Sequence, residues 1–213
     1  MSVAVKICGL NDAAAVAAAV EGRADFVGFV FFPASPRYVE PDIAARLGAA
    51  VPKSVVKVGL VVDADDATLR GIVAGAKVDM LQLHGLESPA RAAEIRARFG
   101  LPVMKAIPVA TAADVDKARD FEAVVDRLMF DARPPKDATR PGGNALPFDW
   151  TLLKGRVFAK PWLLAGGLSA ANVAEAVRAS GARAVDVSSG VEIAPGRKSP
   201  EKILEFLKIA AAL

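Results

Sequence analysis

Cysteine and histidine each occur only once in the 213 residues, as Cys8 and His84. A single cysteine excludes an intramolecular disulfide. One cysteine and one histidine also cannot supply the ligand sets of the usual zinc sites. The sequence therefore indicates neither a disulfide framework nor a zinc centre.

Long hydrophobic runs and strong charge asymmetry are also missing. No apolar run reaches the roughly 18 residues of a membrane span, and residues 1–10 lack the basic and apolar regions of a secretory signal. Lys and Arg number 27 against 24 Asp and Glu, a net charge of +3, with no block of five like charges. We expect a soluble cytoplasmic protein that binds neither membrane nor nucleic acid, and a small anionic substrate fits this balance better.

Eight short apolar runs are spread along the chain, and hydrophobic residues make up 53% of it. Most runs are continuous and do not alternate with polar residues, which is typical of parallel strands covered on both faces. No linker divides the chain, so residues 1–213 are predicted to form a single domain. The predicted strands are residues 3–7, 25–30, 55–60, 80–83, 103–106, 128–130, 162–165 and 184–187.

Helical patterns separate these strands, which favours repeated βαβ units. Eight units in about 200 residues predict a small (β/α)8 TIM barrel, and a doubly wound open sheet is the second architecture considered. The predicted helices are residues 11–20, 41–50, 68–74, 89–99, 113–119, 170–180 and 200–212, with a short one at 148–153. Residues 133–147 form a Pro- and Gly-rich loop after the sixth strand, on the expected catalytic face.

Two candidate residues lie at the end of the first strand. Cys8 follows the apolar run at the face where active sites of this fold lie. A thiolate is a competent base if positive neighbours lower its pKa. Lys6 is predicted to point the same way because side chains alternate along a strand, and it is a candidate substrate-binding residue. A lone cysteine is also commonly a small buried core residue, so Cys8 alone is ambiguous.

Polar residues also end other predicted strands. Arg37 follows the second strand and can bind a carboxylate through two parallel hydrogen bonds, although loop arginines are commonly solvated. His84 ends the fourth strand and either orients a substrate or has a packing role. Asp131 directly follows the sixth strand, which suggests a general acid or base, or alternatively a cap. Asp186, inside the eighth strand, is placed to hold a ribose hydroxyl.

Glycines and serines follow the seventh and eighth strands. This is the position at which many barrels of this fold bind phosphate through backbone N–H groups. Gly-Gly pairs occur in many turns, so neither segment alone is specific. Together they predict a phosphate site formed by Gly166, Gly167, Ser188, Ser189 and Gly190.

These motifs, taken together, resemble the phosphoribosylanthranilate isomerase family. They occur in the family's order over nearly the whole chain: Lys6-Ile7-Cys8-Gly9, Ser35-Pro36-Arg37, Leu81-Gln82-Leu83-His84-Gly85, Phe130-Asp131, Gly142-Gly143, Phe148-Asp149-Trp150, Gly166-Gly167-Leu168, and Asp186-Val187-Ser188-Ser189-Gly190-Val191-Glu192.

The resemblance implies the Amadori rearrangement of an aminoaldose phosphate to an aminoketose phosphate, in tryptophan biosynthesis. It implies that Cys8 is the general base and Asp131 the general acid, that Arg37 meets the anthranilate carboxylate, and that Asp186 contacts substrate. No cofactor is expected, because the anthranilate nitrogen acts as the electron sink. The enzyme is expected to be a monomer or a homodimer.

One position departs from the family pattern. Ala145 stands where the family often has a glycine in the loop before Phe148. If that position needs a positive φ, alanine is strained there or the loop differs locally.

Three other functions compete with this one. A different phosphosugar barrel, such as an indoleglycerol-phosphate synthase-like lyase or a pentose-phosphate epimerase, shares the phosphate site but not the Cys8 and Asp131 pair. A bifunctional isomerase of the histidine pathway typically uses two aspartates, and Cys8 occupies one of those places. A non-catalytic phosphosugar-binding protein leaves Cys8 and Asp131 without a role.

Overall fold

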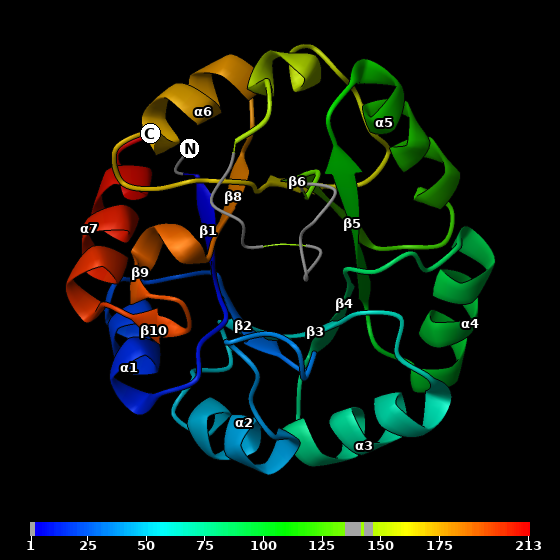
Figure 1. Cartoon of the computed structure of the whole chain (residues 1–213), viewed down its shortest axis with the longest axis vertical. Helices are drawn as coiled ribbons and strands as arrows, with labels where there is room; N and C mark the ends of the chain where they lie inside the picture. The colour runs from blue at the N-terminus through cyan, green and yellow to red at the C-terminus, as the bar shows by residue number, and fades with distance from the viewer. Residues whose placement is uncertain (1–2, 135–141, 143–146) are drawn as a thin grey trace.

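A ring of eight parallel strands forms the centre of the molecule. The computed structural model describes residues 3–134, 142 and 147–213. The ring closes because β1 (Ala4–Cys8) pairs with both β2 (Phe26–Val30) and β8 (Ala184–Val187). Figure 1 looks along the barrel, with the strands inside and the helices around them. Closure excludes the open sheet, and the predicted (β/α)8 barrel is confirmed.

All eight predicted strands are present. The others are β3 (Val56–Val61), β4 (Met80–Leu83), β5 (Val103–Val109), β6 (Arg127–Ala132) and β7 (Trp162–Leu164). Strands β5 and β6 extend beyond the predicted apolar runs, and their pairing continues from Met104 and Arg127 to Val109 and Ala132. Main-chain hydrogen bonds maintain this pairing whatever the side chain, so Asp131 lies inside β6 and not after it.

Seven α-helices lie outside the strands in the described part of the chain: α1 (Ala13–Glu21), α2 (Pro41–Gly48), α3 (Asp66–Ala76), α4 (Pro89–Phe99), α5 (Ala112–Asp116), α6 (Val173–Ser180) and α7 (Pro200–Ala211). Side chains begin several of them: Asp12, Asp65, Ser88 and Ser199 each accept from a backbone N–H of the first turn. Each of these four caps satisfies a backbone N–H that has no partner within its helix.

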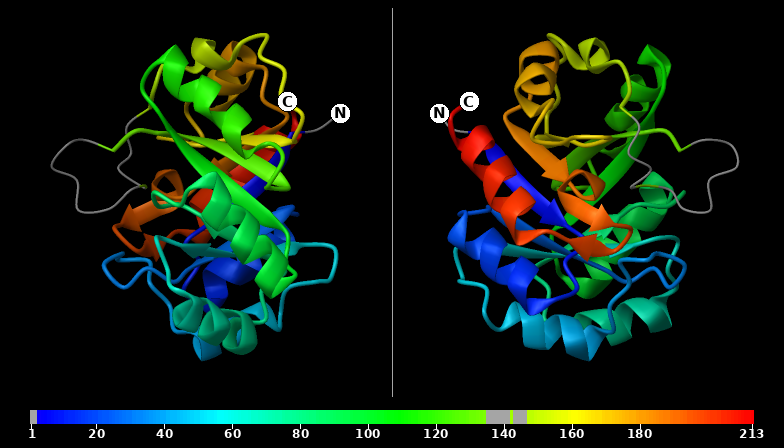
Figure 2. Two further views of the ribbon diagram at one scale, coloured as in Figure 1. Left: turned by 90° about the vertical axis from the view of Figure 1, so that its right-hand side faces the viewer. Right: turned by 60° about the vertical axis from the view of Figure 1, so that its left-hand side comes forward.

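Two helical segments differ from the prediction. The helix expected at 113–119 divides into α5 and a 3-10 helix, η1 (Lys117–Phe121). After β6 the helical position is taken by a short 3-10 helix, η2 (Trp150–Leu153), within the expected 148–153. The last helix, α7, packs beside α1 and completes the outer ring next to β1 (Figures 1 and 2).

A small hairpin after β8 was not predicted. A 3-10 turn, η3 (Ser189–Val191), leads into β9 (Glu192–Ala194), which pairs antiparallel with β10 (Arg197–Lys198). Its turn uses Gly196 at φ 79°, where an added Cβ would lie 2.2 Å from the carbonyl oxygen of Pro36. The hairpin therefore packs against the loop between β2 and α2, beside the arrowheads of β1 and β8 (Figure 2).

The hydrophobic core has two main parts. The larger lies between the strands and the surrounding helices and includes Val27, Phe29 and Leu81. A second cluster fills the barrel interior and includes Met104 and Met129, so the barrel is a packed core and not a pore. No described helix is long and apolar enough to cross a membrane.

Candidate active site

A pocket opens at the carboxyl ends of the barrel strands. It encloses about 810 Å³ of empty space, part of it open to solvent. Nine of the eleven predicted site residues line it: Cys8, Arg37, His84, Asp131, Gly166, Gly167, Asp186, Ser188 and Ser189. The barrel therefore brings together residues spread over some 180 positions of the sequence.

Cys8 is the last residue of β1 and lies at the floor of this pocket. The side chain of Lys6, two residues earlier, is fully buried beneath it, and Lys6 Nζ lies 2.7 Å from Asp186 Oδ1. An added Cβ at Gly28 would be 3.1 Å from both Cys8 Sγ and Lys6 Nζ, so the two groups converge there. Lys6 thus points inward with Cys8, as predicted, but it lies below the pocket and not in its wall.

Burial and charge oppose one another at this pair. Burial raises the pKa of the Cys8 thiol above its ordinary value, and the Lys6 ammonium works in the opposite direction. For Lys6, burial lowers the pKa, but the Asp186 carboxylate and Cys8 together outweigh it, and the pKa lies above the ordinary lysine value. Lys6 therefore remains charged, and it is the cation nearest to any thiolate formed at Cys8.

Asp131, the predicted general acid, lies in β6. Its Oδ1 accepts a hydrogen bond from the backbone N–H of Ala132 at 2.8 Å, and its Oδ2 lies 3.1 Å from Nε2 of His84. Gly142 lies against this pair, since an added Cβ there would be 2.7 Å from His84 Nε2. Both oxygens of the Asp131 carboxyl group therefore have a hydrogen-bonding partner. Neither partner belongs to the first turn of a helix, so Asp131 is not a helix cap.

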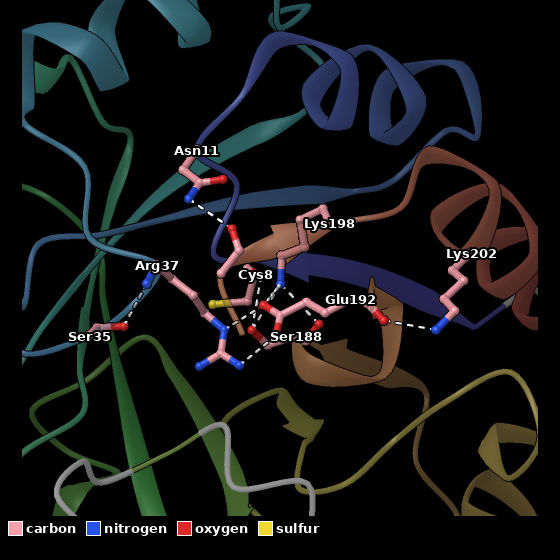
Figure 3. Close-up of polar contacts among 9 residues, drawn as sticks. Cys8, Asn11, Ser35, Arg37, Ser188, Glu192, Lys198 and Lys202 are labelled. Carbon is pink, nitrogen blue, oxygen red and sulfur yellow. Dashed lines mark hydrogen bonds and ion pairs between the residues drawn. The ribbon is translucent and has the colours of Figure 1, made fainter. Parts of the chain in front are cut away.

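Arg37 is buried and its guanidinium is already bound to a carboxylate of this chain. Its Nε and Nη2 donate to Oε1 and Oε2 of Glu192 at 2.7 and 2.9 Å (Figure 3). The described hydrogen bonds do not use Nη1, so the outer edge of the guanidinium remains for a ligand in the pocket. The two parallel hydrogen bonds that the sequence suggested for a substrate are made to Glu192.

Lys198 completes a buried cluster with Arg37 and Glu192. Its Nζ donates to Glu192 Oε1 at 2.9 Å and to the carbonyl oxygen of Ser188 at 2.9 Å (Figure 3). Burial raises the pKa of Glu192, but Arg37 and Lys198 outweigh it, so the pKa lies below the ordinary glutamate value. Burial also lowers the pKa of Lys198. The cluster joins the Arg37 loop to the loop after β8.

The loops after β7 and β8 contact one another directly. An added Cβ at Gly190 would lie 1.9 Å from the carbonyl oxygen of Leu168. Gly166 and Gly167 adopt φ angles of 89° and 65°, a conformation that favours glycine. Among the described residues, the N–H groups of these two glycines donate no hydrogen bond. Gly190 itself does not line the pocket; it lies where the loop after β8 contacts the loop after β7.

Three residues of the site had no role predicted from the sequence. Gln82 lines the pocket from within β4, and Glu192 and Lys198 hold Arg37. A glutamine inside an apolar strand was a usable signal for Gln82, since a buried amide needs a partner. Nothing local in the sequence marks Lys198, because Glu192 faces it only once the hairpin of β9 and β10, which was not predicted, has formed. The predicted departure at Ala145 lies outside the described residues.

A closed parallel barrel with a polar pocket at the carboxyl ends of its strands defines a (β/α)8-barrel enzyme. Sequence comparison then identifies the family: the profile of N-(5'-phosphoribosyl)anthranilate isomerase matches residues 5–209. The chain belongs to the N-(5'-phosphoribosyl)anthranilate isomerase family, whose members act in tryptophan biosynthesis.

Individual relatives agree with this assignment. The chain is 58% identical over 212 residues to the N-(5'-phosphoribosyl)anthranilate isomerase of Paracoccus denitrificans, covering 100% of this chain and 99% of that one. The crystal structure of the Thermotoga maritima enzyme superposes with a TM-score of 0.88 at 34% identity and covers 99% of this chain and 100% of that one. A further isomerase structure, a complex with reduced 1-(o-carboxyphenylamino)-1-deoxyribulose 5-phosphate, has a TM-score of 0.83 at 32% identity, with 99% and 100% coverage.

Proposed function

We propose that this isomerase converts N-(5'-phosphoribosyl)anthranilate to 1-(2-carboxyphenylamino)-1-deoxyribulose 5-phosphate with Asp131 as general acid and Cys8 as general base. The observation that carries these roles is that both side chains line one pocket, from β6 and β1. The product analogue bound by a relative has the same carboxylate, sugar and phosphate parts as this product.

Asp131 starts the reaction by opening the furanose ring. It gives a proton to the ring oxygen while the C1'–O bond breaks and the nitrogen lone pair forms a C1'=N double bond. The carboxylate left on Asp131 is supported by the N–H of Ala132 and by His84. The protonated Schiff base that results acidifies the hydrogen on C2'.

Cys8 completes the rearrangement as a thiolate. It removes the C2' proton, the C1'=C2' double bond forms, and the electrons of the C=N bond return to nitrogen. The resulting enolamine tautomerises to the ketone. Because the anthranilate nitrogen accepts the electrons, the sequence of steps requires no metal and no organic cofactor. Lys6 supplies the positive charge that favours the thiolate.

The two anionic ends of the substrate have separate binding groups. The free edge of the Arg37 guanidinium binds the anthranilate carboxylate, and Glu192 fixes the plane of that guanidinium. The unused N–H groups of Gly166 and Gly167, with Ser188 and Ser189, bind the phosphate. Asp186 binds a ribose hydroxyl from the pocket floor.

Turnover of phosphoribosylanthranilate, followed by the loss of its fluorescence, tests this function. The purified protein is expected to consume the substrate, and Arg37→Ala is expected to raise KM roughly tenfold, as loss of one charged hydrogen-bonding partner does. A wild-type protein that does not consume the substrate would contradict the proposed reaction. An unchanged KM in Arg37→Ala would remove Arg37 from the carboxylate site.

Residues 1–213 are proposed to act as one catalytic domain in the cytoplasm, as a monomer or a homodimer. The strand ring that closes between β1 and β8 supports a single unit. One structure of a Thermotoga maritima relative, 32% identical to this chain, is described as monomers of a dimeric isomerase. Light scattering at several protein concentrations distinguishes the two states for this chain.

A further inference from the structure

Gln82 is a polar side chain placed inside the barrel. It lies in β4 and is fully buried, and its partners in the neighbouring strands, Leu60 and Met104, are apolar. Burying an amide is costly unless hydrogen bonds replace its contacts with water. The hydrogen-bond partners of Gln82 in these apolar surroundings therefore indicate its role in the site.

The amide nitrogen of Gln82 faces two acceptors. Its Nε2 lies 2.8 Å from Nδ1 of His84 and 3.4 Å from Sδ of Met129. A thioether sulfur can only accept a hydrogen bond. As placed, the amide leaves only its Oε1 without a partner among the described residues. Reversing the amide would leave its NH2 group, with two hydrogens, without a partner there and would place the oxygen against this sulfur, which is the costlier arrangement. Gln82 Nε2 is therefore the donor to His84 Nδ1.

The donor at Nδ1 determines where the imidazole of His84 carries its hydrogen. A nitrogen that accepts from Gln82 cannot itself hold a proton, so the neutral ring is protonated at Nε2. This nitrogen lies 3.1 Å from Asp131 Oδ2. We propose that Gln82 is a positioning residue that holds His84 in the Nε2–H tautomer, so that His84 donates to the carboxylate formed when Asp131 releases its proton. This inference rests on the proposed role of Asp131 as general acid.

The tautomer affects the reaction step and not the ground state alone. As Asp131 protonates the ring oxygen, negative charge develops on its carboxyl group, and a fixed N–H donor stabilises that charge. In the opposite tautomer, the lone pair of Nε2 would face Asp131. It would then either repel the new carboxylate or retain the proton that the substrate needs.

The single histidine of the chain allows a direct test on the wild-type protein. With ¹⁵N-labelled histidine, one pair of ring-nitrogen signals reports His84 without assignment ambiguity. We expect Nδ1 at the shift of an unprotonated nitrogen and Nε2 at that of a protonated one at neutral pH. A protonated Nδ1, in either the other tautomer or the imidazolium, would overturn the proposal even if Asp131 is the acid.

Substitutions at Gln82 test the consequence for catalysis. In Gln82→Glu a carboxylate of similar length accepts a hydrogen bond and should move the proton to Nδ1. We expect kcat to fall by at least about tenfold and KM to change less than about threefold. The expected fall in kcat is smaller than the fall caused by removing a donor that binds an oxyanion directly. Met104→Leu, next to Gln82 in register, should alter neither the ring signals nor kcat and controls for barrel packing.

A variant of His84 separates positioning from structure. The side-chain amide of His84→Gln can still donate to Asp131 but has no tautomers. Gln82→Met should therefore lower kcat in the wild-type background and have little effect in the His84→Gln background. An equal loss in both backgrounds would overturn the proposal, because Gln82 would then act by another route. Full activity in Asp131→Asn would instead remove the acid role on which this inference depends.

Discussion

Arg37 and Glu192 lie 155 residues apart in the sequence and form two parallel hydrogen bonds, Nε to Oε1 at 2.7 Å and Nη2 to Oε2 at 2.9 Å. Both side chains are about 5% exposed, and Lys198 bonds the same glutamate. A guanidinium held along one edge has a fixed plane, so its opposite edge is ready for a planar carboxylate. The hairpin after β8 therefore fixes the orientation of Arg37, in the loop after β2, through Glu192.

Glu192→Gln is expected to destabilise the protein by about 3 kcal/mol, because it leaves Arg37 and Lys198 buried without their counter-charge. Urea unfolding measures this change. Asp42→Asn is the matched control, since Asp42 forms an exposed pair with Arg46 that is worth less than about 1 kcal/mol. Equal stability losses in the two variants would show that the buried cluster does not contribute as described.

The reactivity of Cys8 should depend on pH in a definite direction. Because burial raises the pKa of its thiol, the thiolate forms mainly above the ordinary thiol range, and alkylation by iodoacetamide should accelerate there. Lys6→Met removes the cation that opposes this rise and leaves the Asp186 carboxylate, so the profile should move further to alkaline pH. Cys8 is the only cysteine, so alkylation reports it alone. A shift toward acid pH in Lys6→Met would contradict the role of Lys6.

The space around Gly28 is expected to matter more for activity than for stability. An added methyl group would lie 3.1 Å from both Cys8 Sγ and Lys6 Nζ, so these atoms must move by a few tenths of an ångström to make room for it. We expect Gly28→Ala to lower kcat by roughly tenfold or more, since small displacements of reacting groups are costly. Gly71→Ala is the control: no atom lies within 4 Å of its added Cβ, and in helix α3 alanine should stabilise by up to about 1 kcal/mol. Unchanged turnover in Gly28→Ala would show that the Cys8–Lys6 approach is unimportant.

Contact between the loops after β7 and β8, which we propose bind the phosphate, predicts a binding defect in Gly190→Ala. The new methyl group would overlap the carbonyl oxygen of Leu168, so one loop must move. We expect the dissociation constant of inorganic phosphate and the KM for substrate to rise together, by roughly tenfold each, because each lost charged contact is worth about 1.5–3 kcal/mol. Calorimetry with phosphate and steady-state kinetics measure the two quantities. A rise in KM without weaker phosphate binding would place the defect elsewhere.

The barrel was predictable because its signals are local. Continuous apolar runs mark strands covered on both faces, and helical patterns separate them. The hairpin β9–β10 was missed because strands of three and two residues are too short for a recognisable period. Strand β6 was predicted too short because the apolar run ends at Asp131, whereas the hydrogen-bonded pairing with β5 continues to Ala132.

The site was predictable in its members but not in its pairings. The position of Cys8, Asp131 and the glycines at strand ends follows from strand order, which the sequence contains. That Arg37 meets Glu192 depends on side-chain directions in two loops 155 residues apart, and such a contact leaves no periodic trace in the sequence. Gln82 and His84 are only two residues apart, so strand alternation places them on one side, but the hydrogen bond between them is visible only in the folded structure.

The assignment of Cys8 and Asp131 as base and acid is tested most directly by single-turnover kinetics with enzyme in excess over phosphoribosylanthranilate. The rate of fluorescence loss at saturating enzyme reports the chemical steps without product release. We predict a fall of about 100-fold or more in each of Cys8→Ala and Asp131→Asn, the usual size of a general acid or base contribution, with half-saturating enzyme concentration little changed. A single-turnover rate near that of the wild type in either variant would contradict the role of that residue.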